Sequence, residues 1–206
     1  MKTLGILIFF QATYCYSFSQ VDRKTSVILE RILRKDHPQG TLVYTDKLDD
    51  YVILNIKESL KKQIFVGKLA SKKGRDTFIL SKSELKYIDS ILRKLHLVFW
   101  KDSIFSNSKR ISKDSLWSRI DNQNRKSYEN LINATSDSSR NLAKRNWIDN
   151  ANTFQFSIPI FLRSKSIFFF YYIRLCGSMC GVSDLSVYRI ENGVYKKWFL
   201  ISGGAF

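Results

Sequence analysis

The stretch that decides the fold is IFFFYYI, residues 167–173, in which every side chain is apolar or aromatic. A strand with one face in water alternates apolar and polar residues, whereas a strand that is buried on both faces does not. Exposed to solvent, such a run would also be prone to aggregate. The sequence therefore predicts a strand over residues 166–174 at the centre of a sheet, with helices covering it.

Further strand-like runs surround this stretch, at residues 154–162, 185–190 and 195–201. Asn192-Gly193 separates the last two runs and suits a type I′ hairpin turn, because both turn positions need a positive φ. Pro159 has no N–H to donate, so the strand that holds it is expected at an edge or a bulge. These features predict an antiparallel sheet that ends in β-hairpins.

Patterns for helices and strands alternate in the first half of the chain. Residues 21–35 have apolar side chains at helical spacing, and the sequence HPQG ends the pattern. Ser81 and Glu84 have the spacing of a capping box at the start of another helix. Between these helices, β-branched or aromatic runs indicate a meander of strands at residues 41–45, 51–56, 64–69 and 77–80, although residues 58–62 also suit a helical turn.

Residues 101–152 carry weaker patterns. They indicate one short helix near residues 112–120 and a second near 128–132, before a polar loop at 133–141. Taken together, the predicted elements define an α+β fold, with helices packed on a largely antiparallel sheet.

The composition bounds the class of protein. The chain has 206 residues, of which 44% are hydrophobic, with 2 Pro and 9 Gly. These values describe an ordinary globular chain and exclude collagen-like and largely disordered proteins. No run of about 18 apolar residues is present, so a polytopic membrane protein is excluded as well.

The beginning of the chain has the pattern of a secretory signal peptide. A short apolar stretch follows a basic residue, and small residues stand at the minus-three and minus-one positions of a cut between Ser19 and Gln20. A buried first strand or helix is the alternative. A lipid anchor at Cys15 is not expected, because a bulky residue precedes it. We therefore expect a signal peptide over 1–19, a single α+β domain over 20–206, and export to the periplasm, the cell surface or the medium.

The chain is basic, with 34 Lys+Arg against 18 Asp+Glu and a net charge of +16 at pH 7. Lys2 is the only charged residue in the predicted signal, so the remainder keeps 33 basic and 18 acidic residues, a net charge of +15. Bases spread along the chain are normal for a solvated surface, but they also suit an anionic polymer or a membrane surface as partner. Specific binding of nucleic acid is not expected of an exported protein.

Two cysteines remain after the predicted signal, Cys176 and Cys180, each followed by a glycine, Gly177 and Gly181. A close pair in an oxidising compartment is a candidate disulfide, which would shape a turn between two strands. A redox pair is the alternative, but the common redox motif has two intervening residues and opens a helix. A zinc site would need two more ligands, and neither of the 2 histidines lies at ligand spacing.

Familiar catalytic motifs are absent from the sequence, including the nucleophile elbow, the Walker loop, the zinc-protease motif and the dinucleotide fingerprint. Cys180 and His96 are a conceivable nucleophile pair, but His96 follows an apolar helix face and is interpreted as a partly buried structural residue. Asp49 and Asp50 are adjacent in a predicted turn, where carboxylates are usually solvated. The sequence therefore identifies no catalytic residue and gives no reason to expect a metal or a cofactor.

Two segments of the chain resemble a known group of proteins. The string PIFLRSKSIFFFYYIRLCGSMCGVSDLSVYRIENGVYKKW, residues 159–198, resembles the C-terminal part of a family of uncharacterised exported bacterial proteins with a Cys-Gly-x-x-Cys-Gly turn. The string WKDSIFSNSKRISKDSL, residues 100–116, is similar to a weaker segment of the same family, whereas ISGGAF at 201–206 departs from its ending. The resemblance implies export and brings no known activity.

These observations favour an exported, non-catalytic binding or structural module. An exported enzyme with residues scattered along the chain is a second interpretation, and a pocket lined by converging polar groups would support it. A binder of anionic polymers or membrane surfaces is a third, which a contiguous basic face would support.

Overall fold

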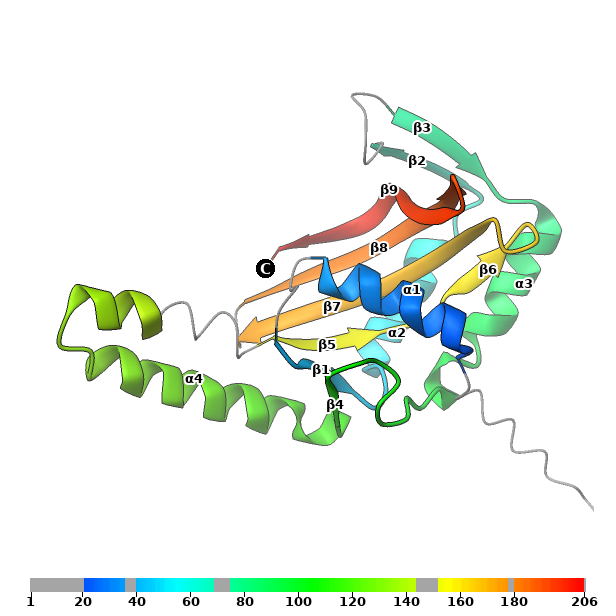
Figure 1. Ribbon diagram of the computed structural model, residues 1–206. Helices are drawn as coiled ribbons and strands as arrows, with labels where there is room; N and C mark the ends of the chain where they lie inside the picture. The colour runs from blue at the N-terminus through cyan, green and yellow to red at the C-terminus, as the bar shows by residue number, and fades with distance from the viewer. Residues whose placement is uncertain (1–20, 36–39, 69–74, 144–151, 178–179, 206) are drawn as a thin grey trace, which may run out of the picture.

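The computed structural model describes residues 21–35, 40–68, 75–143, 152–177 and 180–205 (Figure 1). Its helices and strands follow the chain in the order α1 (Arg23–Arg34), β1 (Leu42–Thr45), α2 (Asp50–Leu60), β2 (Ile64–Lys68), β3 (Arg75–Ile79), α3 (Lys82–Leu92), β4 (Ser108–Ile111), α4 (Leu116–Ile132), β5 (Thr153–Phe156), β6 (Ile160–Leu162), β7 (Ile167–Gly177), β8 (Cys180–Glu191) and β9 (Val194–Ala205).

The main sheet has seven strands in the order β4-β1-β5-β7-β8-β9, and β6 also pairs with β7. Strands β5 to β9 pair in antiparallel fashion, whereas β1 pairs with β4 and β5 in parallel. The predicted α+β class is confirmed, together with the largely antiparallel sheet and its C-terminal hairpins.

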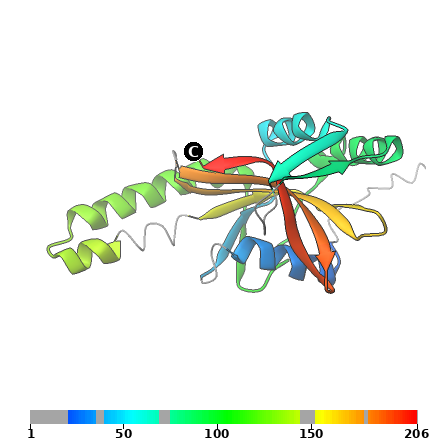
Figure 2. The same ribbon diagram turned by 90° about the horizontal axis from the view of Figure 1, so that it is seen from above.

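Strand β7 lies at the centre of the sheet, as predicted. It is hydrogen-bonded to β8 on one side and to β5 and β6 on the other. Phe168, Phe169 and Phe170 are at most 1% exposed, because α1 covers one face of the sheet and α2 and α3 cover the other (Figures 1 and 2). Burial on both faces explains the absence of polar residues from this strand.

The strand expected over residues 51–56 is wrong, because these residues lie in α2. Val52, Ile53, Ile56 and Leu60 are buried, and this spacing places them on one face of a helix. The β-branched residues favour a strand locally, but packing of that face against the sheet decides the outcome. The predicted meander of neighbouring strands is also wrong. Strands β2 and β3 pair only with each other, whereas β1 belongs to the main sheet.

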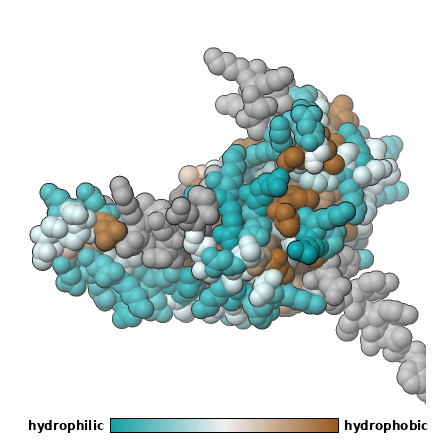
Figure 3. Space-filling model, in the orientation of Figure 1, coloured by the Kyte–Doolittle hydropathy of each residue, from teal (hydrophilic) through white to brown (hydrophobic). Residues whose placement is uncertain are grey.

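The two short helices predicted after residue 112 are one continuous helix, α4. Its sequence holds no Gly or Pro that would end it. Only Leu116 and Ile120 are buried, and the rest of α4 extends from the body with a mostly hydrophilic surface (Figures 1 and 3). Residues 137–141, expected in a loop, are helical, and strand β4 was not predicted.

The single strand expected over residues 154–162 is two strands, β5 and β6. Pro159 lies between them, where its missing N–H interrupts no ladder. The turn between β8 and β9 agrees with its prediction, since Asn192 has φ 52° and Gly193 has φ 75°. The capping box of α3 is also confirmed, with the Glu84 N–H 3.2 Å from the Ser81 hydroxyl.

Candidate functional site

Cys176 and Cys180 form the disulfide that the sequence predicts, with their Cα atoms 5.1 Å apart. The pair closes the turn between β7 and β8, where Gly177 lies opposite Cys180 in the strand register and Gly181 lies opposite Leu175. The disulfide therefore joins two neighbouring strands rather than opening a helix, which is the arrangement of a structural turn. The predicted cleavage site at Ser19 and Gln20, and Cys15, lie outside the described residues.

The other residues that the sequence singled out do not form a catalytic group. His96 is exposed, in a 3-10 turn at Leu95–Leu97, so the interpretation of this histidine as partly buried is wrong. Asp49 precedes α2 and accepts a hydrogen bond of 2.8 Å from the Gln155 amide, and its oxygen lies 3.3 Å from the Lys113 ammonium. Asp50 is 88% exposed. Both carboxylates nevertheless pair with the Lys113 ammonium, the Asp50 oxygen over 3.7 Å, and Asp49 also joins the start of α2 to Gln155 of β5.

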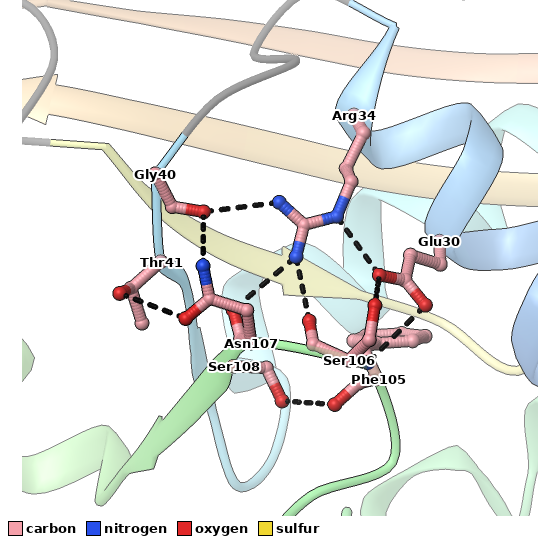
Figure 4. A network of polar contacts seen from close by, with 8 residues as sticks. All are labelled: Glu30, Arg34, Gly40, Thr41, Phe105, Ser106, Asn107 and Ser108. Carbon is pink, nitrogen blue, oxygen red and sulfur yellow. Dashed lines mark hydrogen bonds and ion pairs between the residues drawn. The ribbon is translucent and has the colours of Figure 1, made fainter.

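A network of polar contacts joins α1 to the segment before β4 (Figure 4). Arg34 binds the Glu30 carboxylate and also donates to the carbonyl oxygens of Gly40, Ser106 and Asn107. Burial alone would raise the pKa of Glu30, but hydrogen bonds from Ser106 and Arg34 hold it below its ordinary value. Because the guanidinium is occupied by protein oxygens, this network anchors α1 and leaves little capacity for a ligand.

A second polar group lies inside the C-terminal hairpin. The Ser186 hydroxyl donates to Asp184, and the Lys197 ammonium forms an ion pair with the same carboxylate. Ser186 is 0% exposed. A substrate therefore has no access to its hydroxyl, and the trio satisfies the buried polar atoms of β8 and β9.

A pocket of about 390 Å³ lies between α2 and the strands β7, β8 and β9. This volume is within the usual range of small-molecule sites. From α2 come the polar side chains of Tyr51, Asn55, Glu58 and Ser59, which recur every three or four residues along one helical face. The helix that replaces the predicted strand thus supplies one wall of the pocket.

The strands supply the opposite wall. Ser183 and Leu185 alternate along β8, with Leu185 opposite Tyr171 of β7 on one side and opposite Ser202 of β9 on the other. The register of β8 and β9 shifts immediately after this point, so a β-bulge borders the pocket. Bulges of this kind re-aim side chains at the margins of sheets. Ser202 also lies within hydrogen-bonding distance of Ser59, 3.2 Å between the hydroxyl oxygens, which ties the two walls together.

Tyr171 is the most deeply placed polar residue of the pocket, with 6% of its surface exposed. Burial raises the pKa of its phenol well above the ordinary value, and the nearby Tyr51 adds to this shift. The hydroxyl is therefore neutral at physiological pH and can both donate and accept a hydrogen bond. No side-chain hydrogen bond engages Tyr171, Asn55 or Ser183 within the part of the chain that the structure describes.

The lining is rich in hydroxyl groups and includes one charged side chain, Glu58. Among the described residues that line the pocket there is no His, Cys, Lys or Arg. The Glu58 carboxylate is 57% exposed and forms an ion pair with Lys61. Nor do the described ranges contain a group of three or more His, Cys, Asp or Glu placed to hold a metal ion. The arrangement can bind a polar ligand, but it shows no nucleophile beside a base.

Sequence reasoning missed this pocket because it assigned residues 51–56 to a strand. Read as a helix, the same residues place Tyr51, Asn55 and Ser59 on one face, and that periodicity was the available signal. Their approach to Tyr171 and Ser202 depends on the tertiary fold, for which the sequence carries no local signal.

No described helix is long and apolar enough to cross a lipid bilayer. We compared the chain with protein-family models, with curated proteins and with solved structures, and none of these comparisons gave a match.

Proposed function

We propose that this protein is an exported, non-catalytic binding module that holds a small neutral, hydroxyl-rich ligand, a mono- or disaccharide, in the pocket between α2 and β7–β9. Export is supported by the signal-like N-terminus, by the Cys176–Cys180 disulfide and by the resemblance to exported bacterial proteins. The single observation that carries the binding proposal is Tyr171, a residue only 6% exposed that lines the pocket and whose hydroxyl makes no side-chain hydrogen bond among the described residues.

The ligand class follows from the chemistry of the walls. A hydrogen bond between a ligand and the Tyr171 hydroxyl would contribute about 0.5–1.5 kcal/mol to binding. Serine and tyrosine hydroxyls, the Asn55 amide and the Glu58 carboxylate offer both donors and acceptors, as vicinal sugar hydroxyls require. The lining provides no cation for an anionic ligand, and Ile56 and Leu185 give it an apolar part.

A pocket lined by converging polar groups is also what a scattered-residue enzyme would present. The residues around this pocket favour binding, because its serines have no base beside them and its one carboxylate is largely exposed. Retaining and inverting glycosidases both need two carboxyl groups across the scissile bond. The described lining contains one.

Saturation-transfer NMR with glucose, N-acetylglucosamine and chitobiose tests the proposal. We expect at least one sugar to bind, and Tyr171→Phe to weaken that binding about tenfold, the value of one or two hydrogen bonds. Tyr128→Phe is the matched control, because Tyr128 is 59% exposed on α4 and lies outside the pocket. Equal affinities of Tyr171→Phe and the unmodified protein, or no binding of any of the three sugars, would overturn the proposal, and hydrolysis of chitobiose would overturn its non-catalytic part.

A further inference from the structure

The outer face of the β2–β3 hairpin is an exposed apolar surface. Ile64, Val66 and Ile79 are 54%, 61% and 54% exposed, whereas the alternate residues Phe65 and Phe78 are buried. Ile64 lies directly opposite Ile79 in the strand register, and Val66 follows on the same face. Three large apolar side chains therefore form one stripe, which differs from the isolated apolar residues that are normal on a surface.

The hairpin presents this stripe on a firmly anchored support. On its inner face, Phe65 and Phe78 pack against Phe169 of β7, with ring centroids 5.9 and 5.8 Å apart. The Trp198 indole N–H donates to the Asp76 carboxylate over 3.0 Å. Gly67 allows close approach to the main sheet, because a Cβ there would collide with the Phe199 ring. The hairpin stands at the periphery of the molecule, beyond the edge of β9 (Figure 1).

Two basic residues lie beside one end of the stripe. Lys62 comes two residues before β2 and Lys82 begins α3 after β3, and both are exposed. The acidic residues next to the hairpin are engaged elsewhere, since Glu84 binds Arg163 and Asp76 binds Trp198.

We propose that the outer face of the β2–β3 hairpin docks on an anionic lipid bilayer. Apolar side chains beside exposed lysines are a combination that binds the headgroup region of such a surface, where the apolar groups enter the acyl boundary and the ammonium groups bind lipid phosphates. A stable protein interface needs about 1,000 Å² or more of buried surface, and a stripe of three side chains is small for that purpose. This proposal does not rest on the sugar pocket, because the residues of the stripe and the residues that line the pocket are different.

Sedimentation with vesicles tests this docking surface. The full protein is mixed with vesicles of equimolar phosphatidylglycerol and phosphatidylcholine, and with vesicles of phosphatidylcholine alone. We expect binding to the anionic vesicles and about tenfold weaker binding after the double change Ile64→Ser and Val66→Ser. Val27→Ser with Leu97→Ser is the matched control, because these exposed apolar residues lie outside the hairpin and their loss should leave vesicle affinity unchanged.

A second pair of variants separates this site from a general effect of net charge. Lys62→Glu with Lys82→Glu should weaken vesicle binding by tenfold or more at low salt, since each Lys near an anionic bilayer strengthens the attraction to it. Lys109→Glu with Arg125→Glu changes the net charge equally at exposed positions of β4 and α4, and we expect a smaller effect.

Equal losses in the two charge pairs, or no binding to the anionic vesicles, would overturn the proposal. Loss of self-association in the Ile64/Val66 variant, with vesicle affinity unchanged, would instead identify a second copy of the chain as the occupant and overturn the lipid proposal. Tyr171→Phe should bind vesicles like the unmodified protein, so failure of the pocket proposal and failure of this one are distinguishable.

Discussion

The β8–β9 and β2–β3 hairpins obey the same antiparallel pairing rule, but their surroundings differ. Strand β8 is hydrogen-bonded on both sides and packed on both faces, whereas β2 and β3 bond only to each other and pack on one face. A two-stranded sheet by itself is marginal in water, so β2–β3 depends on its contact with the body. In each hairpin, the proposed binding surface lies where the strands are not covered by the rest of the protein. In β8–β9 this is the open end that lines the pocket, and in β2–β3 it is the exposed outer face.

Breaking the contact between β2–β3 and the main sheet should have the largest effect. Phe78 is 1% exposed and its ring contacts those of Phe169, Trp198 and Phe199. We expect Phe78→Ala to lower the free energy of unfolding by about 3–5 kcal/mol, the usual cost of removing a buried phenyl ring. Denaturant unfolding measures this change.

The neighbouring residue on the outer face is the matched control. Ile79→Ala removes a side chain that is 54% exposed, so its effect should stay below about 1 kcal/mol. Similar losses at residues 78 and 79 would show that the hairpin is not packed on one face alone.

At the open end of β8–β9, the substitution Gly203→Ala tests the close approach of β9 to β8. Gly203 has φ +153°, and a Cβ at this position would collide with the Ser183 carbonyl oxygen. We expect a loss of about 1–3 kcal/mol in the free energy of unfolding, since the backbone conformation is strained for any other residue. Sugar binding should fall as well, because Ser183 and Gly203 both line the pocket.

Gly204→Ala provides the comparison one residue further on. A Cβ at Gly204 meets nothing within 4 Å, so both stability and sugar binding should be preserved. Thermal unfolding and the NMR titration report on the two variants together. Equal behaviour of the two alanine variants would contradict the close approach of β9 to β8.

At the β8–β9 turn, the closed end of the same hairpin, replacing a glycine should destabilise the protein less. Gly193 has φ +75°, and an added Cβ there meets nothing within 4 Å, so only the backbone conformation is affected. Gly193→Ala should cost about 1–2 kcal/mol, the penalty of an L residue in the left-handed region. Chemical denaturation measures it, and sugar binding at the far end of the hairpin should remain as before. A loss of sugar binding comparable to that of Gly203→Ala would mean that the two ends are coupled.

The sequence predicted best those elements whose signal is local. The run 167–173 identifies a strand buried on both faces, the Asn192-Gly193 pair identifies a turn, and the Ser81/Glu84 spacing identifies a helix start. Each of these rests on a few neighbouring residues, and all three agree with the structure. The disulfide belongs to the same group, because its two cysteines are four residues apart.

Elements decided by tertiary packing were predicted poorly. Residues 51–56 are mostly β-branched or aromatic, yet burial of Val52 and Ile56 against the sheet makes them helical. Strand β4 has the polar sequence SKRI, which lacks a strand pattern and pairs because β1 lies beside it. The pocket follows the same rule. Its walls come from α2, β7, β8 and β9, and no local pattern indicates that they meet.

The smallest expected effect is on the pH dependence of stability. It concerns two carboxylates, Glu84 in α3, which follows the β2–β3 hairpin, and Glu191 at the end of β8. Burial alone would raise the pKa of Glu84, but hydrogen bonds from Arg163 and Ser81 outweigh it and hold the pKa below its ordinary value of 4.5. At the β8–β9 turn, the hydrogen bond from Arg189 lowers the pKa of Glu191. A carboxyl whose pKa is lower in the folded state adds stability above its unfolded pKa and loses it as the pH falls through the folded value. We therefore expect the stability of the unmodified protein to decline below about pH 4.5, and Glu84→Gln and Glu191→Gln each to flatten that decline.

Salt distinguishes the two carboxylates and so sharpens the comparison of the hairpins. The Glu84 side chain is 16% exposed between α3 and the turn that holds Arg163, whereas the Glu191 side chain is 34% exposed beside its own turn. Screening acts mainly on charges in contact with solvent. Denaturant unfolding from pH 3 to pH 7, at low and at high salt, should show that the contribution of Glu191 vanishes with salt while that of Glu84 persists. Equal screening of both would place the capping-box carboxylate in solvent, and the exit of the β2–β3 hairpin would then be as open as the β8–β9 turn.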